Sequence, residues 1–325
     1  MSGSALSNQV GAAVGAHAFH VVGPAGVVAV RQWVAAAVLL PLARPPLRRM
    51  SWPQWWPVLL LAVVFGVMNL SLYTAIDRIG LGLAVTLEFL GPLGVALAGS
   101  RSRRDLGMAV TAAGGVYLLV LPGASSDYLG LALGVLAATC WAAYIVLNRV
   151  AGARLPGLQA PAVASALCAV AYLPVLLTLT AQGRLAGAPL LYAVAAGVLS
   201  SAVPYAADLV ALRFVPYRFF GVFMSVHPVL AALVGTALLS QYLVLHEWLG
   251  IAVVVLTNVA AVASGGGAAP LPDSGAAVAP GHGRPPHGGT GNQRSGKPRR
   301  SRQDSPGGLT GCGRPEVISA RGAPT

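Results

Sequence analysis

Charged side chains are scarce in this sequence. Only 9% of its 325 residues are Asp, Glu, Lys or Arg, whereas a soluble globular domain carries about 25%. Hydrophobic residues make up 56% of the chain. So few charges cannot cover a whole exterior in contact with water, which excludes an ordinary soluble domain. We expect most of the protein's surface to face lipid.

Residues and motifs of catalytic and metal sites are also sparse. The sequence has three cysteines, Cys140, Cys168 and Cys312. None has the C-x-x-C spacing of a metal or redox site, and no pairing pattern predicts a disulfide. His246-Glu247 lacks the second histidine of an H-E-x-x-H zinc site, and His17 and His20 have no acidic residue near them in the sequence. The sequence therefore predicts no enzyme, no metal and no cofactor.

Long apolar runs dominate the rest of the chain. There are ten, each of roughly 18–25 residues, the length that crosses about 30 Å of hydrocarbon as a helix. They lie near 4–21, 25–43, 56–76, 81–99, 106–122, 128–147, 158–180, 188–212, 219–240 and 245–263. Strands are excluded because the runs do not alternate and because a span must satisfy its backbone groups internally. The sequence predicts an all-α membrane protein with ten transmembrane helices in the lipid bilayer.

The composition changes after the last run. Residues 264–325 are rich in Gly, Pro, Ser and Arg, and such a segment buries too little apolar surface to offset the entropy of ordering it. We expect a disordered basic tail. A weak contact between its basic residues and anionic lipid headgroups is the alternative.

The basic residues predict the orientation of the chain. The net charge of +12 does not indicate nucleic acid, because these residues sit in short loops and in the tail. Alternate loops carry ten arginines, Arg44, Arg48, Arg49, Arg101, Arg103, Arg104, Arg149, Arg154, Arg213 and Arg218. The other loops carry only Arg78 and Arg184. Because cytoplasmic loops are enriched in Arg and Lys, we expect the first set, and with it both termini, in the cytoplasm.

An internal repeat divides the membrane part in two. With an offset of 136 positions, residues 73–100 align with 209–236 without a gap. The aligned pairs include Pro92 with Pro228 and Gly99 with Gly235. Five helices per half is an odd number, so the halves, 1–122 and 123–263, are expected to be inverted. Inverted repeats are common among alternating-access transporters, whose site lies between the halves near the bilayer midplane.

Four strings share the pattern of one known family. They are 83–93 (LAVTLEFLGPL), 140–144 (CWAAY), 203–205 (VPY) with Asp208, and 220–235. Over about residues 5–263 the chain resembles the EamA family of drug/metabolite transporters, in its threonine/homoserine exporter branch. The resemblance implies a ten-helix inner-membrane exporter of small neutral amino acids or similar metabolites, coupled to protons by antiport.

The chain departs from that branch in three places. Helix nine has His227-Pro228 where the branch reads Glu-Pro, and it ends in Ser240-Gln241 rather than Gly-Glu. The first helix looks short, since the repeat offset would start it about eight residues before Met1, so we expect a truncated or misassigned start. Two alternatives stay open: an exporter of another small metabolite or drug, and a degenerate protein that no longer transports. A homodimer is open as well.

Three charged residues inside the apolar runs are candidates for function. They are Arg31, Glu88 and Asp208. A charge at mid-bilayer is costly and tends to face a partner or a wet cavity. One interpretation is a buried ion pair between Arg31 and Glu88 that locks two helices. The other is that Arg31 or a nearby donor holds a substrate carboxylate while Glu88 exchanges protons.

Polar and aromatic side chains complete the candidate pathway for substrate and protons. Those that could line a cavity are Asn69, Tyr73, Trp141, Tyr144 and Tyr205. Taken singly, each such residue is more often a packing or interface residue. His227 could titrate near neutral pH, or it could bond a backbone carbonyl. Three prolines interrupt the runs and would free carbonyl groups at membrane depth; they are Pro92, Pro204 and Pro228.

Overall fold

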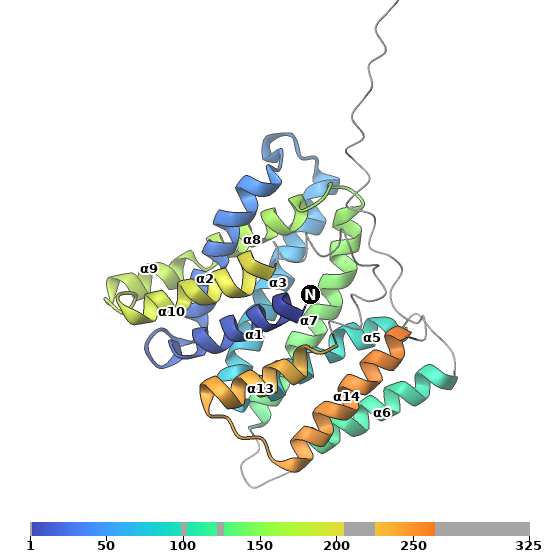
Figure 1. Cartoon of the computed structure of the whole chain (residues 1–325). Coiled ribbons are helices and arrows are strands. Elements are labelled where there is room, and N and C mark those ends of the chain that lie inside the picture. The colour runs from blue at the N-terminus through green and yellow to red at the C-terminus, as the bar shows by residue number, and fades with distance from the viewer. Residues whose placement is uncertain (1, 99–102, 122–126, 205–224, 264–325) are drawn as a thin grey trace, which may run out of the picture. The chain divides into compact units, whose positions relative to one another are not determined.

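A computed structural model describes residues 2–98, 103–121, 127–204 and 225–263. Within these ranges the chain is helical, with no strand (Figure 1). The all-α class is therefore confirmed. The predicted tail at 264–325 lies outside the described residues.

The helices follow the predicted runs closely. The first half contains α1 (Ser2–Ala16), α2 (Phe19–Ala43), the 3-10 turn η1 (Leu47–Arg49), α3 (Trp52–Ile79), α4 (Leu81–Glu88), α5 (Leu90–Ala98) and α6 (Arg103–Leu119). The second half contains α7 (Tyr128–Gly152), α8 (Gln159–Ala171), α9 (Leu173–Ala181), α10 (Ala188–Gly197), the π-helical turn η2 (Val198–Ala202), α13 (His227–Leu239) and α14 (Leu245–Ala263).

Four helices are long and apolar enough to cross a bilayer: α2, α3, α7 and α14. The pair α8 and α9, bent by 42°, makes a fifth span if it is counted as one. The combined α4 and α5, α10 with η2, and α13 are shorter apolar helices. With 15 residues, α1 is about 22 Å long, less than the hydrocarbon core. The ten-span count stays a prediction.

Local sequence sets where the long helices begin and end. Ser51 and Gln54 form a capping box at the start of α3, which satisfies backbone N–H groups that have no helical partner. Asp127 caps α7 by accepting a hydrogen bond from the Gly130 N–H at 2.9 Å. α3 ends at Gly80, whose φ of 86° lies in the left-handed region that favours glycine.

Two predicted runs are interrupted rather than continuous. The run near 81–99 breaks at Phe89, because Pro92 has no N–H to bond the Glu88 carbonyl. The run near 158–180 breaks at Tyr172, because Pro174 likewise has no N–H to bond the Val170 carbonyl. The broken run near 81–99 therefore carries Glu88 at its discontinuity.

The helices pack in pairs that join distant parts of the chain (Figure 1). α3 packs on α7, α2 on α8 and α10, α4 on α13, and α6 on α14, while α1 contacts α10, η2 and α13. Glycine permits the closest approaches. A Cβ at Gly91 would collide with the Ala138 carbonyl of α7, and one at Gly250 would lie 2.8 Å from the Gly115 carbonyl of α6.

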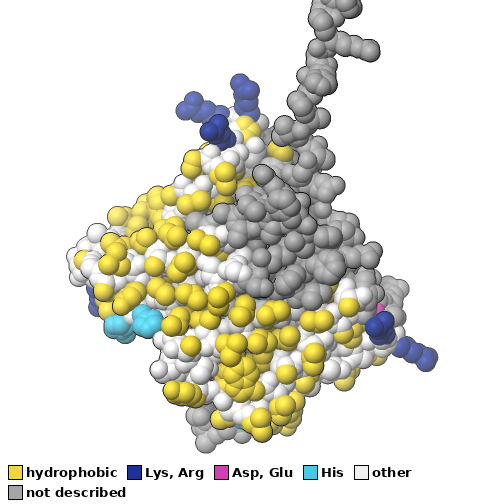
Figure 2. Space-filling view, viewed as in Figure 1, with side chains coloured by type: hydrophobic (Ala, Val, Ile, Leu, Met, Phe, Trp, Pro, Cys, Tyr) yellow, Lys and Arg dark blue, Asp and Glu magenta, His cyan; other side chains and the backbone are white. Residues whose placement is uncertain are grey.

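The exterior carries large apolar side chains along the long helices. Leu60 and Val63 of α3 and Leu256 of α14 are 46%, 62% and 67% exposed. Figure 2 shows hydrophobic side chains over much of one face, with basic side chains at its edges. Such a surface is favourable in lipid rather than in water.

Candidate functional site

Arg31 lies midway along α2, where it contacts two other helical segments. Its Nη1 donates to Asn69 Oδ1 of α3 at 2.8 Å. Its Nε donates to Ser201 Oγ and its Nη2 to the Ser200 carbonyl, each at 3.4 Å. All three acceptors are neutral, so the positive charge of Arg31 is solvated by dipoles and not balanced by a carboxylate within the described residues.

The π-helical turn η2 supplies part of this arrangement. Its Ser200 carbonyl accepts from Arg31 Nη2. Asn69 is held in place by its own bond, since its Nδ2 donates to the Phe65 carbonyl at 2.8 Å. The Asn69 oxygen therefore points to Arg31 with its orientation fixed.

Tyr73 forms one wall beside Arg31. The guanidinium carbon lies over the Tyr73 ring, 5.3 Å from its centroid, a distance at which the ring face attracts a cation. The Tyr73 side chain is only 1% exposed. Its hydroxyl has no hydrogen-bond partner within the part of the chain that the structure describes. A buried hydroxyl without a partner is unfavourable, so this group is available to a bound molecule.

Glu88 is the last residue of α4, directly before the break at Phe89. It is 7% exposed. Among the described residues its carboxylate has no ion pair within 4.0 Å, Arg31 included, although the Arg31 charge acts on it at longer range. The interpretation of a locked Arg31–Glu88 ion pair is thus not what this conformation contains.

An aromatic cluster lies next to Glu88 in the chain. The Phe89 ring packs edge-on to Trp141, with centroids 4.7 Å apart, and lies 5.5 Å from His227. His227 Nδ1 lies 3.1 Å from Gln9 Nε2. His227 is thus within hydrogen-bond distance of a neutral amide.

The structure places five of the predicted site residues in two contact groups. Arg31 contacts both Asn69 and Tyr73, while Trp141 and His227 both contact Phe89. Tyr144 stacks instead on Phe65, with centroids 5.7 Å apart. Two predicted site residues, Tyr205 and Asp208, lie outside the described residues.

Sequence reasoning did not find Ser200, Ser201 and Gln9. The adjacent serines were visible as two hydroxyl residues in an apolar run, four and three positions before Pro204. Gln9 had no comparable signal, because its role depends on a contact 218 positions away. In the described part of the chain no group of three or more His, Cys, Asp and Glu side chains could hold a metal ion.

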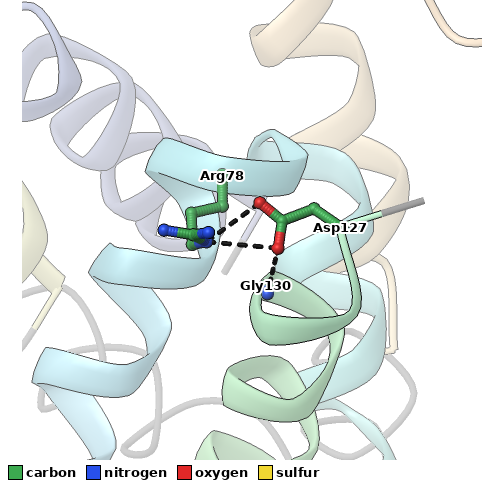
Figure 3. Close-up of polar contacts among 3 residues, drawn as sticks. All are labelled: Arg78, Asp127 and Gly130. Atoms are coloured by element: carbon green, nitrogen blue, oxygen red, sulfur yellow. Dashed lines mark hydrogen bonds and ion pairs between the residues drawn. The ribbon is translucent and has the colours of Figure 1, made fainter. Parts of the chain in front are cut away.

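A separate charged contact joins two helix ends outside the spans (Figure 3). Arg78, at the end of α3, pairs with Asp127, whose carboxylate lies 2.9 Å from Arg78 Nε. The backbone N–H of Gly130 and then Arg78 hold the pKa of Asp127 below its ordinary value of 3.8. The pair is about a third exposed, so it positions helix ends and contributes little to stability.

Long apolar helices with exposed apolar side chains indicate a multi-pass membrane protein. The sequence profile of the EamA-like transporter family matches residues 128–262. The threonine/homoserine exporter RhtA of Salmonella typhimurium (strain LT2) is 34% identical over 262 residues, 80% of this chain and 87% of that protein. RhtA of Escherichia coli (strain K12) is 33% identical over 255 residues, 78% and 86% of the two chains.

The chain belongs to the EamA-like transporter family. It is a membrane transporter and not an enzyme. A solved crystal structure shares the fold with a TM-score of 0.54 at 19% identity, over 81% of this chain and 94% of the other.

Proposed function

We propose that this protein exports small amino acids, threonine and homoserine among them, across the inner membrane in exchange for protons. The observation that carries the proposal is Arg31, a mid-helix cation whose described partners are all neutral. A charged side chain at membrane depth is costly, and such residues usually have a functional role or a partner. A substrate carboxylate is the complementary ligand for a guanidinium fork. The named activity of the RhtA relatives supports this choice.

Glu88 is the proposed proton-exchanging group. It lies at the discontinuity of a broken helix, the kind of place where transporters put their coupling groups. Its carboxylate is not held by a fixed hydrogen bond in the described structure. It is therefore free to alternate between a protonated form and a charged form that faces Arg31 or the solute.

The helix contacts support the proposed two inverted repeats. α2 with α8, α4 with α13 and α6 with α14 each pair a helix with its predicted counterpart. The contact of α3 with α7 is matched by that of α10 with α1, and α4 with α7 is matched by α13 with α1. Contacts of this kind are those expected when two inverted halves enclose one site.

Export from cells tests the proposal. In a host without its own threonine exporter, the wild-type protein should raise tolerance to threonine and homoserine and speed efflux of labelled threonine. Glu88→Gln should abolish efflux while membrane abundance stays within about twofold of wild type, because it keeps shape and removes only the charge.

Two other outcomes would contradict parts of this proposal. No efflux by the wild type of either amino acid would favour the other-solute or the non-transporting alternative. Unchanged efflux by Glu88→Gln, with its pH dependence intact, would move the coupling role to Asp208 or His227. Glu247→Gln, on the first turn of α14 and outside the cluster, is the matched control and should transport normally.

A further inference from the structure

Arg31 and Glu88 are opposite charges, and each follows or precedes a residue of the same apolar cluster in the chain. Val30 and Phe89, their direct neighbours in the chain, belong to the same buried cluster as Tyr73. In the described structure the two charges do not pair within 4.0 Å. Separated opposite charges in a medium of low polarity attract strongly. In this conformation each charge is without a charged partner within 4.0 Å among the described residues.

The guanidinium of Arg31 has N–H groups without an acceptor among the described residues. A guanidinium has five N–H groups, and three of them are used, one on each nitrogen. Among the described residues, one N–H on each terminal nitrogen therefore has no acceptor. A guanidinium can bind both oxygens of a carboxylate through one N–H on each of two nitrogens.

The Glu88 side offers the opposite chemistry. An ionised carboxylate only accepts hydrogen bonds, at about four lone-pair positions. None of these positions is filled by a donor among the described residues, and the side chain keeps 7% of its surface exposed. Its natural ligand is a compact group with several N–H donors and a positive charge, which describes an ammonium.

We propose that Arg31 and Glu88 together bind one zwitterionic amino acid, Arg31 at its carboxylate and Glu88 at its ammonium. This inference rests on the proposed export of amino acids and narrows its substrate class. Each charge-assisted bond is about 2.8 Å long, so a zwitterion placed between the two side chains needs them farther apart than an ion pair. A bound zwitterion brings no net charge, and it leaves neither Arg31 nor Glu88 uncompensated.

The substrate class follows from charge balance. A hydroxy acid such as 3-hydroxybutyrate satisfies Arg31 and leaves Glu88 without a donor. An amino alcohol such as 1-aminopropan-2-ol satisfies Glu88 and leaves Arg31 unbalanced. Each of these two molecules is threonine lacking one charged group. Each should bind the purified wild-type protein about 10- to 100-fold more weakly than threonine, the effect of one lost charge-assisted hydrogen bond.

Variants identify the residue responsible for each loss of affinity. The side chain and the ligand group are removed singly and together, as in a double-mutant cycle. In Glu88→Gln, the advantage of threonine over 3-hydroxybutyrate should shrink to about twofold or less, since both ligands now lack an acidic partner. In Arg31→Gln, the advantage of threonine over 1-aminopropan-2-ol should shrink in the same way. Glu247→Gln and Arg149→Gln, outside the cluster, should keep the wild-type order of all three ligands.

Displacement of labelled threonine from the purified full-length protein at pH 7 is the measurement. If the wild type binds 3-hydroxybutyrate or 1-aminopropan-2-ol as tightly as threonine, the zwitterion site is wrong while amino-acid export can stand. If Glu88→Gln weakens threonine and 3-hydroxybutyrate equally, Glu88 does not bind the ammonium. If the wild type binds none of the three, the proposed function itself fails. The wild-type ligand series stays decisive even where a variant does not fold.

Discussion

At the scale of single residues, removal of the buried Tyr73 hydroxyl should affect protein stability and threonine binding differently. It has no partner in the described structure, so Tyr73→Phe removes a desolvated group that stabilises nothing in the empty protein. We expect the thermal midpoint of the purified protein to stay unchanged or to rise. Threonine affinity should fall about tenfold if the hydroxyl bonds the solute. Thermal unfolding and threonine displacement measure the two effects.

Tyr172 provides the matched control for this substitution. Its hydroxyl donates to the Gly66 carbonyl at 2.9 Å, so Tyr172→Phe removes this bond and should cost about 1 kcal/mol of stability. Threonine affinity should not change, because the Tyr172 hydroxyl is already bonded to α3 and is not available to a solute. A loss of stability in Tyr73→Phe equal to that in Tyr172→Phe would show that the Tyr73 hydroxyl has a structural partner.

Part of the candidate site could be predicted from the sequence, because a charged side chain is costly in a lipid environment. Arg31 and Glu88 are visible because a charge in an apolar run is rare. Asn69 and Tyr73 were predicted as cavity residues, but Ser200 and Ser201 were not, since a serine in a helix has many uses. Only the fold brings Ser200 and Ser201 to Arg31, 169 and 170 positions away in the chain.

At the scale of helices, Gly91 sets the distance between α5 and α7. A Cβ there would collide with the Ala138 carbonyl and lie 3.2 Å from the Ala142 nitrogen. Gly91→Ala should force the helices apart at a cost of about 1–3 kcal/mol, and it should disturb the packing of Phe89 on Trp141. Unfolding of the purified protein in denaturing detergent gives the stability, and labelled threonine gives the transport.

Gly94 is the control on the same helix. A Cβ at Gly94 meets no atom within 4 Å, so Gly94→Ala should be neutral or stabilising by up to about 1 kcal/mol, the difference in helix propensity. Equal effects of the two alanines would mean that helix propensity, and not close packing at Gly91, decides the outcome.

The capped start of α7 responds to acid in a defined direction. The folded pKa of Asp127 lies below its ordinary value of 3.8, so its stabilising contribution is full above that value and is lost as the pH falls through the folded pKa. Wild type should therefore be more stable than Asp127→Asn at pH 7, and the difference should disappear on acidification below pH 3.8. Thermal unfolding of both proteins across this range tests it.

Arg78→Gln refines this acid test. It removes the ion pair and keeps the hydrogen bond from Gly130 to Asp127. Because the bond from Gly130 is the larger cause of the lowered pKa, Arg78→Gln should retain most of the acid dependence. If the wild type remains more stable than Asp127→Asn in strong acid, the ionised Asp127 carboxylate is not the source of the difference in stability.

The helices could be predicted well because the bilayer restricts the choices. A span must be apolar, about 20 residues long and internally hydrogen-bonded, and the runs meet those conditions. The breaks at Phe89 and Tyr172 were harder to place. Proline indicates where a hydrogen bond is lost, but packing decides whether the helix bends or separates, and the two breaks lie three and two residues before their prolines.

At the scale of the whole molecule, the orientation is the property on which direction of transport depends. Arginine counts of ten against two separate the two sets of loops, and such asymmetry places the richer set in the cytoplasm. An odd number of helices per half then inverts one half relative to the other. Both predictions depend on the ten-span count, because one span more or fewer would exchange the sides of every later loop.

Reporter fusions test count and orientation together. A fluorescent reporter that folds in the cytoplasm should be active after Ala263, and a phosphatase that folds outside should be active near Asp127. A fusion in the Arg48 loop is the cytoplasmic control. An active phosphatase after Ala263, or a cytoplasmic signal near Asp127, would mean that the span count or the orientation is wrong. If both positions behave as expected, Glu88 lies in a helix that begins on the outer side, which is the side from which a proton must arrive in an exporter driven by antiport.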